Sequence, residues 1–167
     1  VINEALQEAA QALGLFYPPD PASKGSCTLG GNIAHSSGGP RCVKYGTTKD
    51  YVLNLEVVLA NGEIIQTGAN VLKNSTGYHL TQLMVGSEGL LGIVTKIVFR
   101  LIAKPQHELL LLAPFASAES AATAVNSVLL TGVLPSALEL MEESGVRISA
   151  QATQTHFPFY ENAEFYM

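Results

Sequence analysis

The chain has 167 residues, of which 47% are hydrophobic and 14% are charged, and its formal net charge at pH 7 is -5. This length and composition suit one globular domain, or one small domain and part of another, and they exclude a disordered chain. The acidic balance and the absence of a lysine or arginine cluster in the sequence argue against a nucleic-acid partner. So low a charged fraction is compatible with apolar surface that further protein covers.

Residues 2–13 begin the chain with apolar side chains at helical spacing, and Gly14 follows where a helix would end. The pattern predicts an amphipathic helix whose apolar face is made by the following residues: Ile2, Leu6, Ala9, Ala10 and Leu13. Residues 51–60 and 63–67 are two β-rich runs on either side of Asn61-Gly62. This dipeptide favours a tight turn with positive φ at both central residues, so we expect a hairpin.

Residues 76–89 predict a further helix that ends at Gly86, with its apolar face listed here: Tyr78, Leu80, Leu83 and Met84. Residues 92–102 then predict one strand, and Pro105 marks a break.

After Pro105 the sequence pattern predicts the order strand, helix, strand, helix. We expect strands at 107–115 and 135–141, a helix from Ser117 to Gly132 with the serine as its N-cap, and a weaker helix at 142–153. The aromatic tail, 156–167, shows no closing element. This pattern predicts a second domain that has only begun.

The segment from Pro18 to Gly46 is rich in glycine and small polar residues. Glycine allows a close approach of backbone to a ligand, and a run of free amides forms an anion-binding concavity. Gly30-Gly31 can start a short helix whose N-terminus faces a diphosphate. Neither a P-loop nor a Rossmann fingerprint is present, and a purely structural loop is the alternative.

A second glycine cluster, "GSEGLLGIV" at 86–94, joins the expected helix to the following strand. By itself it can be read as an ordinary helix-to-strand connection.

Three motifs in order carry a resemblance to a known family: "PPDPAS", "CTLGGNIAHSSGGPRCVKYGTTKDYVLNLEVVLANGEII" and "VGSEGLLGIVTKI". They resemble the FAD-binding domain (PCMH type) of the vanillyl-alcohol-oxidase type flavoproteins. Within that group they are most similar to the branch of the glycolate oxidase FAD subunit, D-lactate dehydrogenase and D-2-hydroxyglutarate dehydrogenase. The resemblance implies an α+β fold class, with a mixed, mainly antiparallel sheet flanked by helices. Residues 1–104 would be the C-terminal part of the FAD-binding domain, and 105–167 the beginning of an α+β substrate cap.

The resemblance also implies which residues bind non-covalent FAD. The first segment would pass along the diphosphate and the flavin, the second would supply amides to the dinucleotide, and the third would run beside the adenosine or the isoalloxazine, with Ile93 as a backbone partner. The cofactor-binding residues implied in this way are Pro19, Asp20, Pro21, Ser23, Ser26, Cys27, Thr28, Gly30, Gly31, Asn32, Ala34, His35, Ser36, Gly38, Gly39, Tyr45, Glu88, Gly89, Gly92, Ile93 and Val94.

Two of these assignments have an alternative in the sequence itself. His35 can be a bystander beside the cofactor, and Tyr45, with Lys44, can either approach the flavin or pack beneath the loop while the lysine stays at the surface. Arg41 presents the same choice between the ligand and the surface. None of the four histidines has a second metal ligand at i+2 to i+4, so no metal site is predicted.

The implied parent activity is oxidation of a D-2-hydroxy acid by hydride transfer to flavin, with electrons passed to a quinone, another flavoprotein or a redox chain. No catalytic base is assigned within the chain. We expect the chain to be about a third of the enzyme and to bind FAD weakly or not at all by itself. The alternative is a stand-alone binding or interaction module that has kept the fold, and either case predicts a homo-oligomer through exposed apolar surface.

Cys27 and Cys42 are the only cysteines, and they form neither a disulfide framework nor a metal knuckle. The apolar runs are too short to span a bilayer, and the N-terminus lacks the order of a signal peptide. The sequence therefore predicts a cytoplasmic protein without a transmembrane segment.

Overall fold

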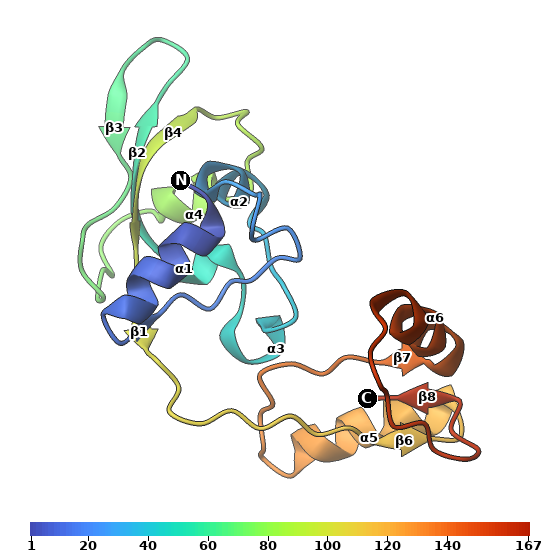
Figure 1. Cartoon of the computed structure of the whole chain (residues 1–167). Coiled ribbons are helices and arrows are strands. Elements are labelled where there is room, and N and C mark those ends of the chain that lie inside the picture. The colour runs from blue at the N-terminus through green and yellow to red at the C-terminus, as the bar shows by residue number, and fades with distance from the viewer. The chain divides into compact units, whose positions relative to one another are not determined.

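The computed structural model describes all residues from Val1 to Met167 as two compact units, unit 1 (Val1–Gln106) and unit 2 (His107–Met167). Helices and small antiparallel sheets alternate in both (Figure 1), which confirms the α+β class. None of the helices is long and apolar enough to cross a membrane.

Unit 1 contains four α-helices, one 3-10 helix and five strands. In chain order they are α1 (Asn3–Ala12), β1 (Leu15–Phe16), α2 (Leu29–His35), α3 (Cys42–Tyr45), η1 (Thr48–Tyr51), β2 (Val52–Val58), β3 (Ile64–Gln66), α4 (Leu80–Met84), β4 (Ile93–Phe99) and β5 (Ile102–Ala103).

Strand β2 is the centre of a three-stranded antiparallel sheet with the order β3-β2-β4. Its Leu55 and Val57 are fully buried and pack with Ile33 of α2 and Met84 of α4. These contacts place both short helices over the same sheet, and the β2–β3 hairpin extends beyond them (Figure 1). The sheet is therefore the support on which both glycine clusters rest.

A second cluster of buried side chains, centred on Tyr17, Leu29 and Tyr51, joins the glycine-rich segment to η1. The Tyr17 ring lies 4.9 Å from that of Phe99, centroid to centroid, at the end of β4. Strand β1 pairs with β5, so the start of unit 1 is connected to its end.

Helix α1 has the predicted range, and Ala10 and Leu6 of its predicted apolar face do pack inward, but the rest of that face is corrected. Leu13 is 77% exposed, whereas Asn3, Gln7 and Ala10 are buried. Positions i, i+4 and i+7 lie on one helix face. The amides of Asn3 and Gln7 are satisfied by hydrogen bonds inside the unit, so the buried face combines these polar side chains with Ala10.

The hairpin is present, but its predicted turn is wrong. Gly62 has φ +87° and Asn61 does not have a positive φ. The Leu59 amide donates to the Glu63 carbonyl (2.8 Å), and the Gly62 amide donates to the Leu59 carbonyl (2.9 Å). The loop therefore has three residues, with glycine in the left-handed position that forms a bulge.

Two further predictions in unit 1 are corrected. The helix expected within 76–89 is only α4, and it buries Thr81 and Met84, while Tyr78 is 95% exposed. The strand expected at 92–102 is two strands, because β4 pairs with β2 whereas β5 pairs with β1. Packing against two different partners interrupts the ladder at Arg100.

Unit 2 contains β6 (Pro114–Phe115), α5 (Ala118–Leu130), β7 (Met141–Glu142), α6 (Glu143–Thr153) and β8 (Phe165–Tyr166). Both predicted helices are confirmed, and the Ser117 side chain caps α5 by accepting from the Ser120 amide (3.2 Å). Of the strand predicted at 107–115 only β6 is formed, and Leu110 is 93% exposed; of the strand predicted at 135–141 only Met141 lies in a strand, β7.

The aromatic tail does supply a closing element, contrary to expectation. Strand β8 is the central strand of the sheet β6-β8-β7, and its Tyr166 is fully buried. The Tyr166 ring lies 5.0 Å from that of Phe157 in an edge-on arrangement. A long-range pairing of two residues leaves no periodic signal in the sequence, which explains the omission.

Candidate functional site

The proline-containing start of the glycine-rich segment is held by the buried face of α1. Gln7 Nε2 donates to the Pro19 carbonyl (2.9 Å), and Asn3 Nδ2 donates to the same oxygen (3.3 Å). Asn32 Nδ2 of α2 donates in turn to Asn3 Oδ1 (3.0 Å). Buried amides that are all paired fix the backbone to which they bond. The segment before α2 therefore has a defined position.

Helix α2 begins where the sequence predicts, at the two glycines. Thr28 is its N-cap, and the threonine Oγ1 accepts from the Gly31 amide (3.1 Å). The Gly30 amide belongs to the first turn, which has no acceptor inside the helix, and Gly30 is exposed with nothing within 4 Å of the place of a Cβ. The backbone is therefore accessible to a ligand at this point.

The second glycine cluster is bonded directly to the end of α2. The Gly86 amide donates to the Ile33 carbonyl and the Glu88 amide donates to the Ala34 carbonyl, each at 2.9 Å. The last carbonyls of a helix lack the regular intrahelical partner, and this loop donates to two of them, of which the Ile33 carbonyl also accepts from the Ser36 amide (3.2 Å). Two glycine-rich stretches about fifty residues apart in the sequence are thus one structural site.

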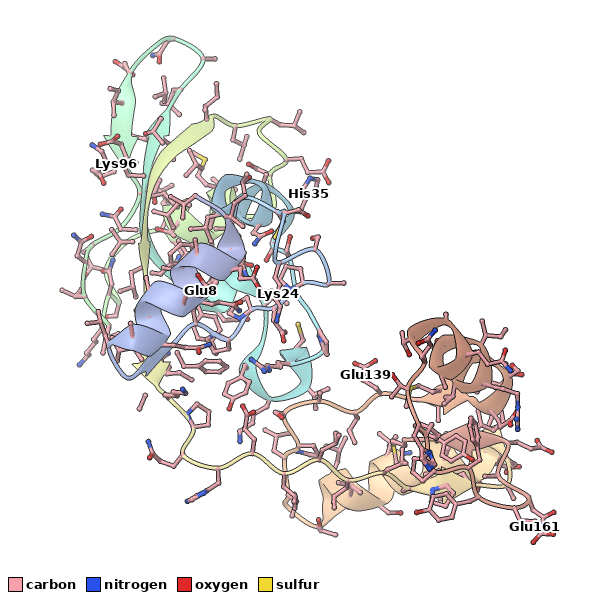
Figure 2. The ribbon with its side chains drawn as sticks, viewed as in Figure 1. Glu8, Lys24, His35, Lys96, Glu139 and Glu161 are labelled. Carbon is pink, nitrogen blue, oxygen red and sulfur yellow. The ribbon has the colours of Figure 1, made fainter.

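Residues around this junction have uncommon backbone conformations. Ser36 (φ 48°) and Glu88 (φ 53°) are both in the left-handed region without being glycine. His35 Nδ1 lies 3.8 Å from Glu88 Oε1, with both side chains about two thirds exposed, and Figure 2 shows His35 at the surface. Non-glycine residues in this region are strained and gather at functional sites.

Close packing explains two of the predicted glycines. A Cβ on Gly39 would lie 2.6 Å from the Asp20 carbonyl carbon and 2.7 Å from Asp20 Oδ1. A Cβ on Gly92 would lie 2.5 Å from Val57 Cγ1 of the central strand. These glycines bring backbone segments together, whereas Gly30 and Gly89 face open space.

Asp20 is the titratable group of the site with a perturbed pKa. Its side chain is 12% exposed; Oδ2 lies 3.3 Å from Arg41 Nε, while Oδ1 is buried without a hydrogen-bond partner. Burial raises the pKa of the Asp20 carboxyl above its ordinary value, and the nearby Arg41 and Lys24 charges oppose that rise.

Tyr45 and the two cysteines lie in the same glycine-rich segment, and each has a defined environment. Tyr45 packs edge-on against Phe16 (centroids 5.7 Å apart), and its carbonyl accepts from the Tyr51 hydroxyl (2.8 Å), as expected for a ring beneath the loop. Cys27 and Cys42 are free thiols, and Cys42 Sγ accepts from the Gly39 amide (3.1 Å).

The predicted residues fall into two groups. One group surrounds α2 and the 86–94 loop and comprises Thr28, Gly30, Gly31, Asn32, Ala34, His35, Ser36, Glu88, Gly89, Gly92, Ile93 and Val94. The other lies along the 19–27 segment and the turn that packs on it and comprises Pro19, Asp20, Pro21, Ser23, Ser26, Cys27, Gly38 and Gly39. Asn3 and Gln7, which hold the Pro19 carbonyl, were not among the predicted residues, although two amide side chains spaced i, i+4 on a helix are a visible signal.

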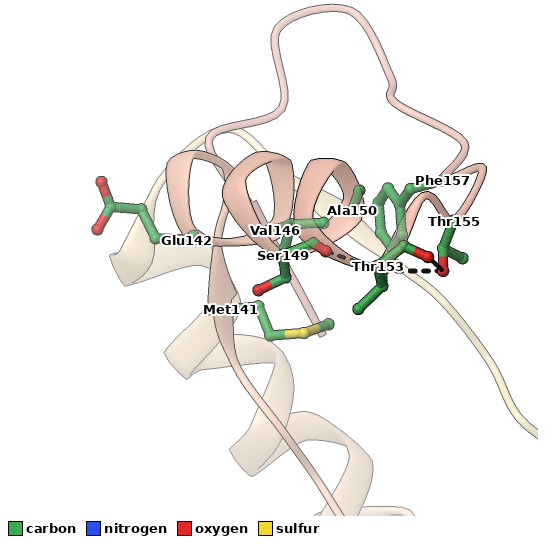
Figure 3. A pocket seen from close by; sticks show the side chains of 9 residues that line it. Met141, Glu142, Val146, Ser149, Ala150, Thr153, Thr155 and Phe157 are labelled. Atoms are coloured by element: carbon green, nitrogen blue, oxygen red, sulfur yellow. Dashed lines mark hydrogen bonds between the residues drawn. The ribbon is translucent and has the colours of Figure 1, made fainter.

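A separate depression of about 430 Å³ lies within unit 2 (Figure 3). Met141, Val146 and Phe157 contribute its apolar wall, and the hydroxyls of Thr153 and Thr155 lie 2.9 Å apart at one end. None of the predicted cofactor residues lines it. No group of three or more histidine, cysteine, aspartate or glutamate side chains in the chain is arranged to hold a metal ion.

Comparison with known families gives the class of protein to which this fold belongs. Residues 1–68 match the family described as "FAD binding domain", and residues 104–167 match "FAD linked oxidases, C-terminal domain". The chain belongs to the FAD-linked oxidases, whose cofactor is FAD.

The relatives give the branch within this family. The chain is 48% identical over 143 residues to "Glycolate oxidase subunit GlcD" of Bacillus subtilis (strain 168), covering 86% of the chain and 30% of the relative. It is 44% identical over 146 residues to "D-lactate dehydrogenase" of Anaerostipes hadrus, covering 87% and 30%. The chain thus spans about 30% of the length of these relatives.

Solved structures agree on the fold. One described as "alkyldihydroxyacetonephosphate synthase in P1" superposes with a TM-score of 0.72 at 25% identity, covering 89% of this chain and 29% of that one. A second crystal form gives a TM-score of 0.75 at 22% identity, covering 99% and 32%.

Proposed function

We propose that the chain is part of an FAD-dependent oxidoreductase that oxidises a D-2-hydroxy acid. The observation that carries the proposal is the union of the two glycine clusters at the end of α2, through the Gly86 and Glu88 amides, in a chain of the FAD-linked oxidase family. Relatives named as a glycolate oxidase subunit and as a D-lactate dehydrogenase support the substrate class.

The residues present fit a dinucleotide by their chemistry. The Gly30 amide and the Thr28 hydroxyl at the start of α2 are donors suited to a diphosphate, and both residues are exposed. The 86–92 loop, held against α2, would bind through its backbone, and Ile93, the first residue of β4, would be a further backbone partner. FAD, when bound, supplies the two-electron acceptor of the oxidation.

Within the chain, the proposed roles are binding and positioning. Residues 1–104 would form the C-terminal part of the FAD-binding domain, and residues 105–167 the beginning of the substrate cap. The side chains of Asn3 and Gln7 would hold the 19–21 backbone where it meets the cofactor, since both bond to the Pro19 carbonyl. A geometry held by buried bonds is what dinucleotide orientation requires.

A chimera tests this proposal. The matching third of the Bacillus subtilis glycolate oxidase subunit would be replaced with residues 1–167 of this chain, and flavin content would be measured by absorbance, with oxidation of glycolate and D-lactate followed by reduction of an artificial dye. We expect a yellow, active chimera. A folded chimera that carries no flavin contradicts the proposal.

Flavin binding by the isolated chain is a second test of the proposed function. With only part of the site present, we expect it to be colourless after purification. A stoichiometric flavin spectrum with micromolar or tighter affinity would show that the chain holds a complete site and would overturn that expectation.

A further inference from the structure

The side chain of Arg41 is oriented by two contacts but keeps donors free. Its Nε lies 3.3 Å from Asp20 Oδ2, and its guanidinium carbon lies 5.2 Å from the centre of the Phe16 ring. The two terminal nitrogens make no hydrogen bond within the chain, and the side chain is 32% exposed. An arginine fixed at Nε and stacked on a ring presents its remaining donors as a fork of fixed direction.

The surroundings of this fork are cationic in an acidic chain. Lys24 lies close enough to Asp20 to oppose the rise of the carboxyl pKa, and Lys44 follows Arg41 on α3 with its Nζ 5.4 Å from the centre of the Tyr45 ring. Two cations, Arg41 and Lys24, thus act on one half-buried carboxylate, although the net charge of the chain is -5. The Asp50 carboxylate at the end of this segment is occupied by the Thr47 amide (2.7 Å).

The backbone beside Arg41 is held in place as well. The Gly39 backbone is packed against Asp20 so closely that a Cβ would clash, and its amide is bonded to Cys42 Sγ (3.1 Å). The Thr48 hydroxyl donates to the Ser37 carbonyl (2.7 Å) and fixes the other end of the turn. The fork is therefore mounted on a rigid turn and not on a free loop.

We propose that Arg41 is an oxyanion-binding residue, held in position by Asp20, whose terminal nitrogens bind the diphosphate of the dinucleotide or the carboxylate of the 2-hydroxy acid. The inference rests on the proposed function for the identity of these two anions. It also explains why the chain keeps a half-buried carboxylate whose Oδ1 is buried and unpaired: Asp20 directs the guanidinium. A buried and incompletely paired charge costs stability, and such groups gather at functional sites.

The test is a titration of the 167-residue chain with inorganic pyrophosphate and, separately, with D-lactate, followed by the amide signals of residues 36–46 in NMR spectra. We expect saturable shifts with at least one of the two anions. Arg41→Gln should weaken that binding at least about tenfold, because a charge-assisted hydrogen bond is lost. Arg41→Lys keeps the charge but not the fork, and its affinity should fall between the two.

Two further variants keep the test decisive. Arg41→Gln leaves Asp20 without its partner and so can destabilise unit 1, whereas the double variant Asp20→Asn with Arg41→Gln removes the pair together and should fold while losing the anion. Lys96→Gln is the charge-matched control, because Lys96 lies on β4 on the opposite side of unit 1 from Lys24 (Figure 2), and its affinity should stay within roughly twofold of the parent chain.

The outcomes are separable. Binding of pyrophosphate that depends on Arg41 assigns the diphosphate, and binding of D-lactate that depends on Arg41 assigns the carboxylate. Equal affinity in the parent chain and in Arg41→Gln, or no saturable shift with either anion, overturns the inference. Neither result is affected by the flavin content of the chimera, which tests the proposed function by itself.

Discussion

Gly39 and Gly30 both belong to the glycine-rich segment, yet the structure predicts opposite effects for an added methyl group. In Gly39→Ala the new Cβ would lie 2.6 Å from the Asp20 carbonyl carbon and 2.7 Å from Asp20 Oδ1. The carbonyl cannot rotate away, because the preceding Pro19 is held by Gln7 and Asn3. Forced overpacking of this kind costs about 1–3 kcal/mol of unfolding free energy.

Gly30→Ala is the matched substitution without the clash. Nothing lies within 4 Å of the new Cβ, and residue 30 is in α2. Alanine in a helix is favoured over glycine by about 0.5–1 kcal/mol, so this variant should be more stable than the parent chain. The two variants should therefore differ by roughly 1.5–4 kcal/mol in the unfolding of unit 1.

The assay must report on unit 1, because the two units of the chain need not unfold in a single transition. Hydrogen exchange of the peptide that contains β2 meets this need, because β2 is the central strand of the main sheet, and urea titrations followed by circular dichroism would accompany it. A Gly39→Ala variant as stable as Gly30→Ala would refute the claim that close backbone contact, and not chain flexibility, requires glycine at position 39.

Two further predictions concern buried polar groups of the same region. Because burial raises the pKa of Asp20 in the folded chain, the folded state binds the proton more tightly than the unfolded state, so this group adds stability as the pH falls through the interval between the two pKa values and loses it as the pH rises. The parent chain should accordingly gain stability relative to Asp20→Asn when urea titrations are moved from pH 7 toward pH 4, and a relative loss would contradict the assignment. Tyr17→Phe should keep or raise stability, since burial raises the pKa of the Tyr17 hydroxyl to about 12 and this group is buried without a hydrogen-bond partner. Tyr51→Phe should instead cost about 0.5–1.5 kcal/mol, because the Tyr51 hydroxyl donates to the Tyr45 carbonyl (2.8 Å); thermal unfolding of both variants checks the order, which the opposite ranking would disprove.

Local signals in the sequence were sufficient for several elements. The spacing of residues 2–13, the Ser117 cap and the β-rich runs beside Asn61-Gly62 each predicted an element that the structure contains. In these places the determinants lie within a few residues of one another, as they do for caps, turns and short-range periodicity. The motifs that carry the family resemblance are likewise local runs of sequence.

The tertiary structure alone decided which faces are buried and what the glycines contact. Asn3 and Gln7 are buried because the Pro19 carbonyl and Asn32 lie opposite them, and β5 separates from β4 because β1 offers it a different partner. The meeting of the 86–94 loop with α2, and of Asp20 with Gly39 and Arg41, joins residues that are far apart in the chain. Such contacts depend on chain folding and not on neighbouring residue types, so a single sequence contains no periodic trace of them.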